Sequence, residues 1–321
     1  MAEKKIVCVT GAGGYVASWL VKFLLSRGYT VNGTVRNPSD EKYSHLKKLE
    51  KSSDNLKLFK ADMLDYNSLS PPIKYCSGVF HLASPVPIGT ITNPEVQMIE
   101  PAVKGTQNVL KACSEASVRR VVVMSSLAAV TMNPNWPKGQ LKDETCWSDI
   151  EFCRTTNNWY HFAKTVAESE AFELAKRSGL DVVSVCPAIV LGPMLQSSMN
   201  ASSLVLLEHL KDGNEEMENK VRIIVDVRDI VEAMLLLYEK PEAEGRYVCN
   251  AHTIKTKYLV EMLKGMYPNY NYPKKFCDWE EIEELSYLSS KKLQRLGWSH
   301  RPLEETLVDS IESYKQNGLL N

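Results

Sequence analysis

Three residues in the middle of the chain have the types and the spacing needed to move a proton. Tyr160 and Lys164 lie four positions apart in NWYHFAK, and Ser126 ends the stretch VVVMSS. On a helix, side chains four positions apart share a face. An ammonium beside a phenol favours the phenolate, which makes the phenol a competent proton donor to a carbonyl undergoing reduction. A serine hydroxyl could orient that carbonyl and stabilise the developing oxyanion, and Ser125 is a rival for this place because spacing does not show which hydroxyl points inward.

A glycine-rich stretch, VTGAGGYVAS, follows an apolar segment and opens a helical one. A strict G-x-G-x-x-G pattern fails, because Val16 takes the sixth position, but Gly11, Gly14 and Ala17 are spaced three apart. The first glycine permits a tight turn, the second lets backbone approach a pyrophosphate, and the alanine lets helix pack on strand. Free N–H groups at the helix start would hold the phosphates. The expected dinucleotide contacts are Gly11, Gly13, Gly14, Tyr15 and Val16.

The second strand indicates which dinucleotide is bound. An NAD site would carry an acidic residue about 20 residues after the glycines, whereas an arginine there suits the 2'-phosphate of NADP. This chain has Arg36 in TVRNPSDEK and Lys42 six positions later, so it predicts NADPH. Downstream, Asp62 and Met63 follow the third strand. The Asp62 carboxylate could accept from the adenine amino group, or it could cap the next helix.

The elements that must position these residues alternate between strand-like and helix-like segments. The strand-like segments are 6–10, 31–35, 56–61, 78–83, 120–126 and 181–190. Helical patterns lie between them, and the one after NWY ends at Gly179 as helices commonly do. Near-continuous apolar strands joined by helices predict a Rossmann-type, doubly wound α/β fold with a parallel sheet. In that fold, ligands bind at the carboxyl edge of the sheet, where Ser126 would lie.

The pattern loosens after Pro187, with polar loops between further helices. We therefore predict an NADP-binding domain over 1–187, with a strand and helix around 221–250 returning to it. Residues 188–321 would form a smaller, interleaved substrate-binding lobe.

Composition excludes several classes of function. With 38 Lys and Arg against 39 Asp and Glu, the chain has no general positive charge to bind nucleic acid or a membrane surface. The first residues, MAEKKIVCVT, pass from charge directly into a strand rather than a signal peptide, which favours a cytoplasmic protein. The eight cysteines show no CxxC spacing, so we expect reduced, buried thiols and no metal site.

With these motifs in this order, the chain resembles the extended short-chain dehydrogenase/reductases almost from end to end. Phrases such as GVFHLASPV, EPAVKGTQNVLKA, DETCWSDIEFCR and LSSKKLQRLGW are similar to those of the plant phenylpropanoid branch, which contains cinnamoyl-CoA reductases and dihydroflavonol reductases. The resemblance implies that Tyr160 is the proton donor, Lys164 the ribose-binding lysine, Ser126 the catalytic serine, and Arg36 with Lys42 the 2'-phosphate pair. It also places Ala83, Ser84, Pro187, Ala188 and Val190 along the cofactor.

Substrate contacts are expected from Val86, Leu127, Met132, His161 and Tyr287, each of which is also an ordinary packing candidate. Cinnamoyl-CoA reductases typically read NWYCYGK where this chain has NWYHFAK. They also commonly carry a His and a Lys facing coenzyme A, at positions that match Val205 and Glu208 here. A carboxylate would repel the polyanionic coenzyme.

The expected function is therefore NADPH-dependent reduction of an aromatic aldehyde to its alcohol, similar to a short-chain-type cinnamyl alcohol dehydrogenase. Reduction of hydroxycinnamoyl-CoA thioesters is the alternative. An NADP-binding regulatory protein without turnover is a hypothesis of another class, but such a protein would be expected to lose Tyr160 or Lys164. We expect a monomer or weak homodimer acting on a small molecule, without nucleic acid, membrane or metal.

Overall fold

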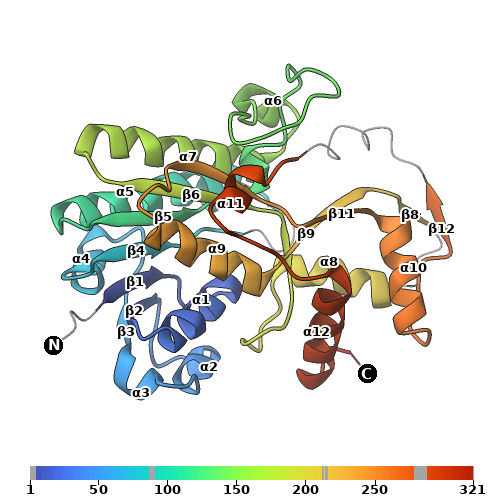
Figure 1. The fold of residues 1–321 in the computed structure, drawn as a ribbon, viewed down its shortest axis with the longest axis horizontal. Helices are drawn as coiled ribbons and strands as arrows, with labels where there is room; N and C mark the ends of the chain where they lie inside the picture. Colours follow the sequence, from blue (N-terminus) through green and yellow to red (C-terminus); the bar gives the residue numbers. More distant parts are fainter. Residues whose placement is uncertain (1–4, 87–90, 212, 214–215, 278–287, 321) are drawn as a thin grey trace.

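A seven-stranded parallel sheet forms the centre of the molecule. The computed structural model describes residues 5–86, 91–211, 213, 216–277 and 288–320 (Figure 1). From one edge to the other, the strands are β10 (Gly245–Cys249), β6 (Val182–Pro187), β5 (Arg120–Met124), β4 (Gly78–His81), β1 (Ile6–Thr10), β2 (Thr30–Val35) and β3 (Leu56–Lys60). Each neighbouring pair is parallel. The predicted doubly wound sheet is thus confirmed, and the order of its strands reverses beside β1.

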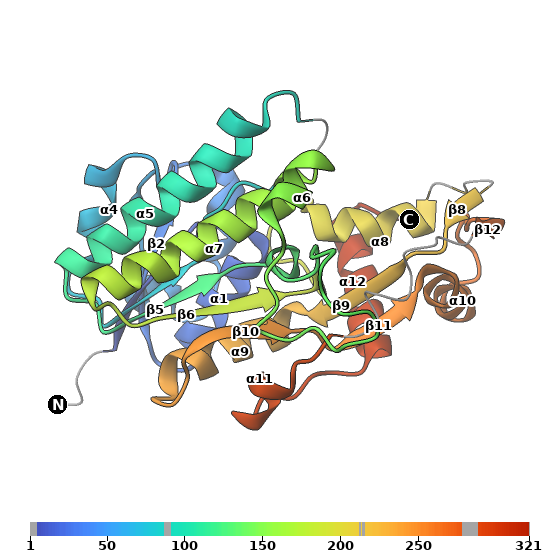
Figure 2. The same ribbon diagram turned by 90° about the horizontal axis from the view of Figure 1, so that it is seen from above.

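Helices cover both faces of this sheet (Figure 2). One face packs against α4 (Tyr66–Ile73), α5 (Glu100–Glu115) and α7 (Trp159–Ser178), and the other against α1 (Tyr15–Ser26) and α9 (Val227–Glu239). In β5, Val121 and Val123 pack towards the first face and Val122 towards the second. Because both faces are buried, the strands need no polar alternation, which explains their continuous apolar sequence. Full burial of such a side chain stabilises the fold by about 1.5–3 kcal/mol.

Shorter elements connect these layers. They are η1 (Glu41–Tyr43), α2 (Ser44–Lys47), α3 (Ser52–Asn55), the π-helical turn η2 (Glu95–Ile99), η3 (Leu127–Ala129) and α6 (Ile150–Thr155). The expected end of α7 is confirmed, since Gly179 caps it with a φ of 72°. That left-handed conformation favours glycine, so the helix stops where the sequence predicts.

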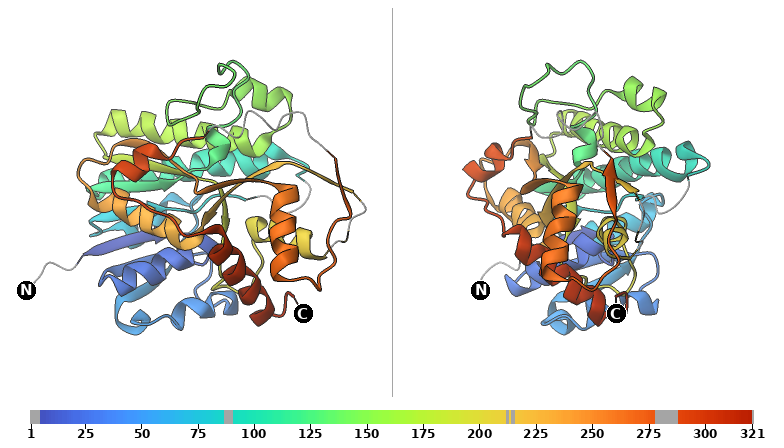
Figure 3. Two further views of the ribbon diagram at one scale, coloured as in Figure 1. Left: turned by 45° about the vertical axis from the view of Figure 1, so that its right-hand side comes forward. Right: turned by 90° about the vertical axis from the view of Figure 1, so that its right-hand side faces the viewer.

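A second group of elements lies at one end of the sheet (Figure 3). It contains a three-stranded sheet of β11 (His252–Lys255), β9 (Val221–Asp226) and β7 (Ile189–Leu191), and a pair of strands, β12 (Lys275–Cys277) and β8 (Glu216–Glu218). Its helices are α8 (Ala201–Lys211), α10 (Thr256–Met266) and α12 (Leu303–Gln316), whereas α11 (Lys291–Arg295) packs against β10 of the main sheet.

The single strand expected over 181–190 is in fact two strands in different sheets. β6 ends at Pro187, Ala188 donates its N–H to the Cys249 carbonyl, and β7 then pairs with β9. An apolar run looks the same on either side of such a change of sheet. Likewise, β9 stays in the three-stranded sheet, and the elements that return to the main sheet are α9 and β10.

Side-chain hydrogen bonds hold the second group of elements against α1. The Tyr15 hydroxyl donates to the Gly192 carbonyl at 2.9 Å, and the Trp19 indole donates to the Pro193 carbonyl at 2.7 Å. From the other side, the Gly192 N–H donates to the Ser310 hydroxyl of α12 at 2.8 Å. The segment after β7 is therefore held between the first and the last helix, beside the glycine-rich loop.

Candidate active site

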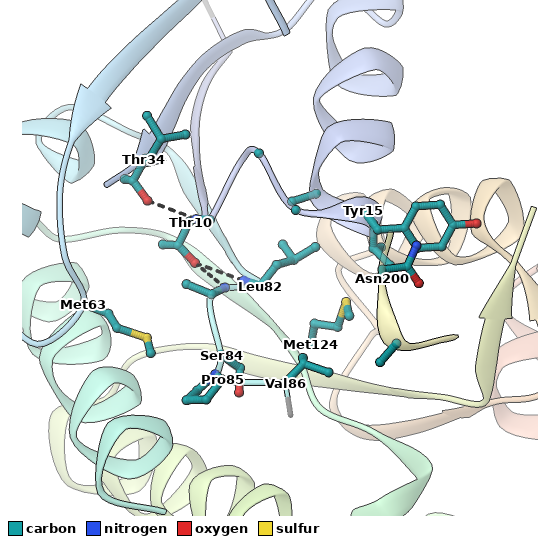
Figure 4. A pocket seen from close by; sticks show the side chains of 18 of the residues that line it. Thr10, Tyr15, Thr34, Met63, Leu82, Ser84, Pro85, Val86, Met124 and Asn200 are labelled. Atoms are coloured by element: carbon teal, nitrogen blue, oxygen red, sulfur yellow. Dashed lines mark hydrogen bonds between the residues drawn. The ribbon is translucent and has the colours of Figure 1, made fainter. Parts of the chain in front are cut away.

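A cavity of about 740 Å³ opens at the carboxyl ends of β1, β2, β4 and β5. It lies where the strand order reverses, the usual position for a ligand in this class of sheet. Side chains from both parts of the chain converge on it (Figure 4). Of the predicted cofactor and catalytic residues, those that line it are Gly11, Gly13, Gly14, Tyr15, Val16, Arg36, Lys42, Asp62, Met63, Ala83, Ser84, Ser126, Tyr160, Pro187, Ala188 and Val190.

The glycine-rich loop is fixed to the ends of two neighbouring strands. Gly11 has a φ of 65°, and a β-carbon there would lie 3.1 Å from the Ala83 α-carbon, so only glycine fits without strain. The Thr10 hydroxyl accepts from the N–H groups of Leu82 and Ala83, each at 3.0 Å (Figure 4). These bonds join the ends of β1 and β4 at the floor of the cavity.

His81 lies buried beneath this floor and completes its hydrogen bonding. One ring nitrogen lies 2.9 Å from the Thr10 hydroxyl and the other 3.2 Å from the Thr106 hydroxyl. Burial, and then the charge of Lys164, lower the pKa of His81 to about 3. The ring is therefore neutral at physiological pH, where it spaces the two hydroxyls without adding charge.

Gly13 lies under an aromatic ring that the sequence did not single out. A β-carbon at Gly13 would lie 2.2 Å from Cδ1 of Tyr43, and the Tyr43 ring lines the cavity. The first turn of α1 starts beside it, after Gly14, without any side-chain cap. The uncapped N–H groups and the aromatic wall together suit the phosphates and the base of a dinucleotide.

A methyl group at Gly13 is expected to disturb this packing. Gly13→Ala should displace Tyr43, destabilise the protein by about 1–3 kcal/mol, and weaken NADPH binding. Gly265→Ala on α10 is the matched control, because nothing lies within 4 Å of its added carbon. Denaturant unfolding and titration of NADPH by fluorescence measure the two effects. Unchanged affinity and stability in Gly13→Ala would show that Tyr43 does not form a fixed wall.

Two cations stand at the end of β2, where the 2'-phosphate is expected. Arg36 and Lys42 are exposed and line the cavity. Lys42 Nζ lies 2.7 Å from an Asp40 carboxylate oxygen, so the two side chains form an ion pair. The Asp62 carboxylate accepts from the Leu64 N–H at 2.9 Å and does not cap α4, because that cap is Asp65. The helix-cap alternative for Asp62 is thus wrong.

Ser126, Tyr160 and Lys164 come together at the other end of the cavity. Ser126 and Tyr160 line it, and Lys164 borders a small adjoining space together with Ala83 and Ser84. Lys164 is only 6% exposed, and its Nζ lies 5.9 Å from the centre of the Tyr160 ring. Arg36 and Tyr160 line the same cavity, so one dinucleotide could contact both.

The two neighbouring serines have different environments. The Ser125 hydroxyl is buried and donates to the Glu168 carboxylate at 2.8 Å. The Ser126 hydroxyl oxygen accepts from the Ala128 N–H at 3.2 Å and, being half-buried, keeps its own hydrogen available to a ligand. This arrangement favours Ser126 over Ser125 as the residue that faces a substrate.

Of the predicted substrate residues that the structure describes, Val86 alone lies on the cavity wall. Val86 lines the cavity and is exposed. Leu127 is buried in η3, and Met132 packs against a neighbouring apolar cluster, so neither lies on the cavity wall. His161 stands edge-on to Tyr160 outside that wall, and burial lowers its pKa to about 4. Tyr287 lies outside the described residues.

The segment between β7 and α8 supplies a further wall of the cavity. The lining residues from this segment and the start of α8 are Gln196, Ser198, Met199, Asn200, Ala201 and Ser202. Asn200 is a residue type favoured at helix starts, and its side chain accepts from the Ser203 N–H at 3.0 Å. That signal locates the helix but does not show that it approaches the glycine-rich loop.

Comparison with known proteins defines the class. A parallel Rossmann sheet with a glycine-rich loop and a Ser-Tyr-Lys set is the arrangement of a short-chain dehydrogenase/reductase. The model of the NAD dependent epimerase/dehydratase family matches residues 7–250. The chain therefore belongs to this family of extended short-chain dehydrogenase/reductases, and the family resemblance predicted from its motifs is confirmed.

Several individual proteins are similar to this chain over nearly its whole length. Cinnamoyl-CoA reductase 1 of Petunia hybrida is 48% identical over 317 residues, which cover 98% of this chain and 94% of that protein. Vestitone reductase from alfalfa (Medicago sativa L.) has a similar solved structure, with a TM-score of 0.83 and 30% identity over 99% of this chain and all of that one. The yeast methylglyoxal/isovaleraldehyde reductase Gre2, solved with NADPH, has a TM-score of 0.83 and 26% identity, covering 98% and 100% of the two chains.

Other kinds of site find no support within the described part of the chain. Its residues include no group of three or more His, Cys, Asp or Glu side chains placed to bind a metal ion. Among those same residues, every helix is too short or too polar to cross a bilayer. All eight cysteines are free, seven of them buried.

Proposed function

We propose that the protein is an NADPH-dependent reductase of phenylpropanoid substrates that converts an aromatic enal into its alcohol. One observation carries this proposal: Ser126 and Tyr160 line the same cavity as the glycine-rich loop and Arg36. Lys164 stands beside Tyr160. A cofactor site and a proton donor are thus combined in one enclosure, which suits hydride transfer to a carbonyl.

The residues present fit NADP(H). The uncapped start of α1 would hold the pyrophosphate, Tyr43 and Asp62 would border the adenine, and Arg36 with Lys42 would bind the 2'-phosphate. Relatives support this cofactor, since Gre2 was solved with NADPH. When bound, NADPH supplies the hydride. We assign residues 1–187 to cofactor binding and most of 188–321 to covering the substrate.

The side chains of the protein supply position and a proton. Tyr160 donates its hydroxyl proton to the carbonyl oxygen as negative charge develops there. Lys164, charged and almost fully buried, favours the resulting phenolate and would also bind the ribose. The Ser126 hydroxyl donates a hydrogen bond to the same substrate oxygen and fixes its direction. Because His81 is neutral, Lys164 is the cationic side chain that borders the small space beside the cavity.

Helix α8 favours an aldehyde over a coenzyme A thioester. Its first turn lines the cavity, and it continues through Val205, which is half-buried, to Glu208, which is exposed. At these two positions, cinnamoyl-CoA reductases commonly carry a His and a Lys. A carboxylate and an aliphatic side chain offer no bond to a polyanionic coenzyme, and the carboxylate repels it.

Thioester reduction is the second candidate, and the relatives favour it. The similarity to Cinnamoyl-CoA reductase 1 of Petunia hybrida extends over nearly the whole of both chains. Such an enzyme would use the same Ser126, Tyr160 and Lys164, so the two candidates differ only in what holds the remote part of the substrate.

Substitution of Val205 and Glu208 on α8 is expected to change the substrate preference. The wild-type protein should show a higher kcat/KM with coniferaldehyde than with feruloyl-CoA. Val205→His combined with Glu208→Lys should raise kcat/KM for feruloyl-CoA roughly tenfold, which corresponds to a change of about 1.4 kcal/mol. The reason is that repulsion of the coenzyme by the Glu208 carboxylate is replaced by attraction to a cation. Coniferaldehyde turnover should stay close to the wild-type value.

Glu173→Lys is the control for this exchange. Glu173 is exposed on α7, and the substitution adds the same charge as Glu208→Lys without altering α8. An equal gain in Glu173→Lys would mean that overall charge steers the coenzyme. A wild-type preference for feruloyl-CoA would establish the second candidate, and no turnover of either compound would favour a cofactor-binding protein without catalysis.

A further inference from the structure

A buried ion pair lies directly behind the proposed catalytic residues. Glu168 on α7 and Arg246 on β10 are joined by two hydrogen bonds of 3.0 Å, and the Glu168 side chain is completely buried. The Ser125 hydroxyl donates to one carboxylate oxygen and the Ser184 hydroxyl to the other. The carboxylate therefore has several donors, which a buried charge requires.

Arg246 connects the pair to the chain segment that follows β5. Its guanidinium donates to the Ala129 carbonyl at 3.0 Å, the Cys146 carbonyl at 2.8 Å and the Glu144 carbonyl at 3.1 Å. It also lies 3.5 Å from the centre of the Trp147 ring. Burial lowers the pKa of Arg246, but its interactions with Glu168 and Cys186 outweigh burial and the net pKa is raised, so the guanidinium stays charged.

These contacts reach both halves of the proposed catalytic set. Ser125 precedes Ser126, and Ala129 ends η3, the turn that Ser126 caps. Glu168 is one helical turn beyond Lys164, which is one turn beyond Tyr160, and all three lie on α7. The chain segment that carries the serine and the helix that carries the tyrosine and lysine are thus attached to the same ion pair.

We propose that Glu168 and Arg246 are positioning residues that set Ser126 against Tyr160 and Lys164. Neither side chain lines the main cavity, so neither contacts the substrate. This inference rests on the proposed function, because it gives Ser126 a place in carbonyl reduction.

A double-mutant cycle separates positioning from general stability. Glu168→Gln should lower kcat for coniferaldehyde roughly tenfold or more, because a misaligned oxyanion donor is largely lost to catalysis. NADPH affinity should stay within about twofold, since Arg36 and the glycine-rich loop are untouched. In a Ser126→Ala background, Glu168→Gln should have little further effect, because the group that it positions is already gone.

Two further variants complete the design. Glu170→Gln is the matched control: it lies on the same helix and accepts from Gln107 at 3.1 Å, away from both serines. Its kcat should equal the wild-type value. Ser125→Ala removes the direct bond between Glu168 and the serine segment but leaves the Arg246 bond to Ala129, and it carries the test if Glu168→Gln does not unfold cooperatively. Its kcat should fall, and that fall should vanish in the Ser126→Ala background.

The results of these variants separate failure of the positioning role from failure of the proposed reductase function. If Ser126→Ala alone keeps full activity, the assigned serine is wrong and the proposed mechanism fails. If Ser126→Ala is impaired but Glu168→Gln and Ser125→Ala are not, only the positioning inference fails. If Glu168→Gln reduces kcat by the same factor in both backgrounds, the ion pair acts through the whole fold, which also overturns the inference.

Discussion

Tyr160→Phe should lower kcat for coniferaldehyde by roughly 10²–10⁴-fold, the usual contribution of a positioned general acid. The substitution removes one oxygen from a half-buried ring and leaves the α7 backbone and Lys164 in place. NADPH affinity and thermal stability should therefore change little. Stopped-flow measurement of NADPH oxidation, with a separate NADPH titration, distinguishes loss of chemistry from loss of binding.

Tyr258→Phe is the control for that variant. Tyr258 is exposed on α10 and does not line the cavity, so its hydroxyl should be dispensable. Full reductase activity in Tyr160→Phe would refute the assigned proton donor, because no other described tyrosine near the cavity stands beside Lys164.

Arg36→Ala should abolish most of the preference for NADPH over NADH. A hydrogen bond to a charged group contributes about 1.5–3 kcal/mol, so KM for NADPH should rise roughly 10–100-fold. KM for NADH should stay nearly constant, since that cofactor carries no 2'-phosphate. Lys42→Ala should have a smaller effect, because Lys42 already shares its charge with Asp40.

The matched control is Arg27→Ala. Arg27 is an exposed arginine at the end of α1 and does not line the cavity. An unchanged ratio of the two KM values in Arg36→Ala would mean that the 2'-phosphate is recognised elsewhere, and the NADP assignment from this strand end would then be wrong.

The strands and the main helices were predictable because their signals are local. β1, β2 and α7 have the expected positions within a residue or so, since apolar continuity and the Gly179 stop are properties of neighbouring residues. The change of sheet after Pro187 was not predictable, because the partners of β7 and β9 are chosen by contacts distant in sequence.

In the site, too, features set by neighbouring residues were predictable and features set by contacts distant in sequence were not. The glycine-rich loop, Arg36 and the Tyr160–Lys164 pair follow fixed spacings, and the structure brings each to the wall of the main cavity or the small space beside it. Tyr43 covers Gly13 through a fold of the chain that no local pattern describes. The choice between Ser125 and Ser126 likewise depends on Glu168, 43 positions away from Ser125.

The purified wild-type protein should oxidise NADPH in the presence of coniferaldehyde and form coniferyl alcohol in equal amount, with NADPH preferred over NADH. The rate of NADPH oxidation, followed by identification of the product, measures this reaction. Absence of alcohol formation with either cofactor, from a protein that binds NADPH and unfolds cooperatively, would contradict the claim that Ser126, Tyr160 and Lys164 form an aldehyde-reducing site.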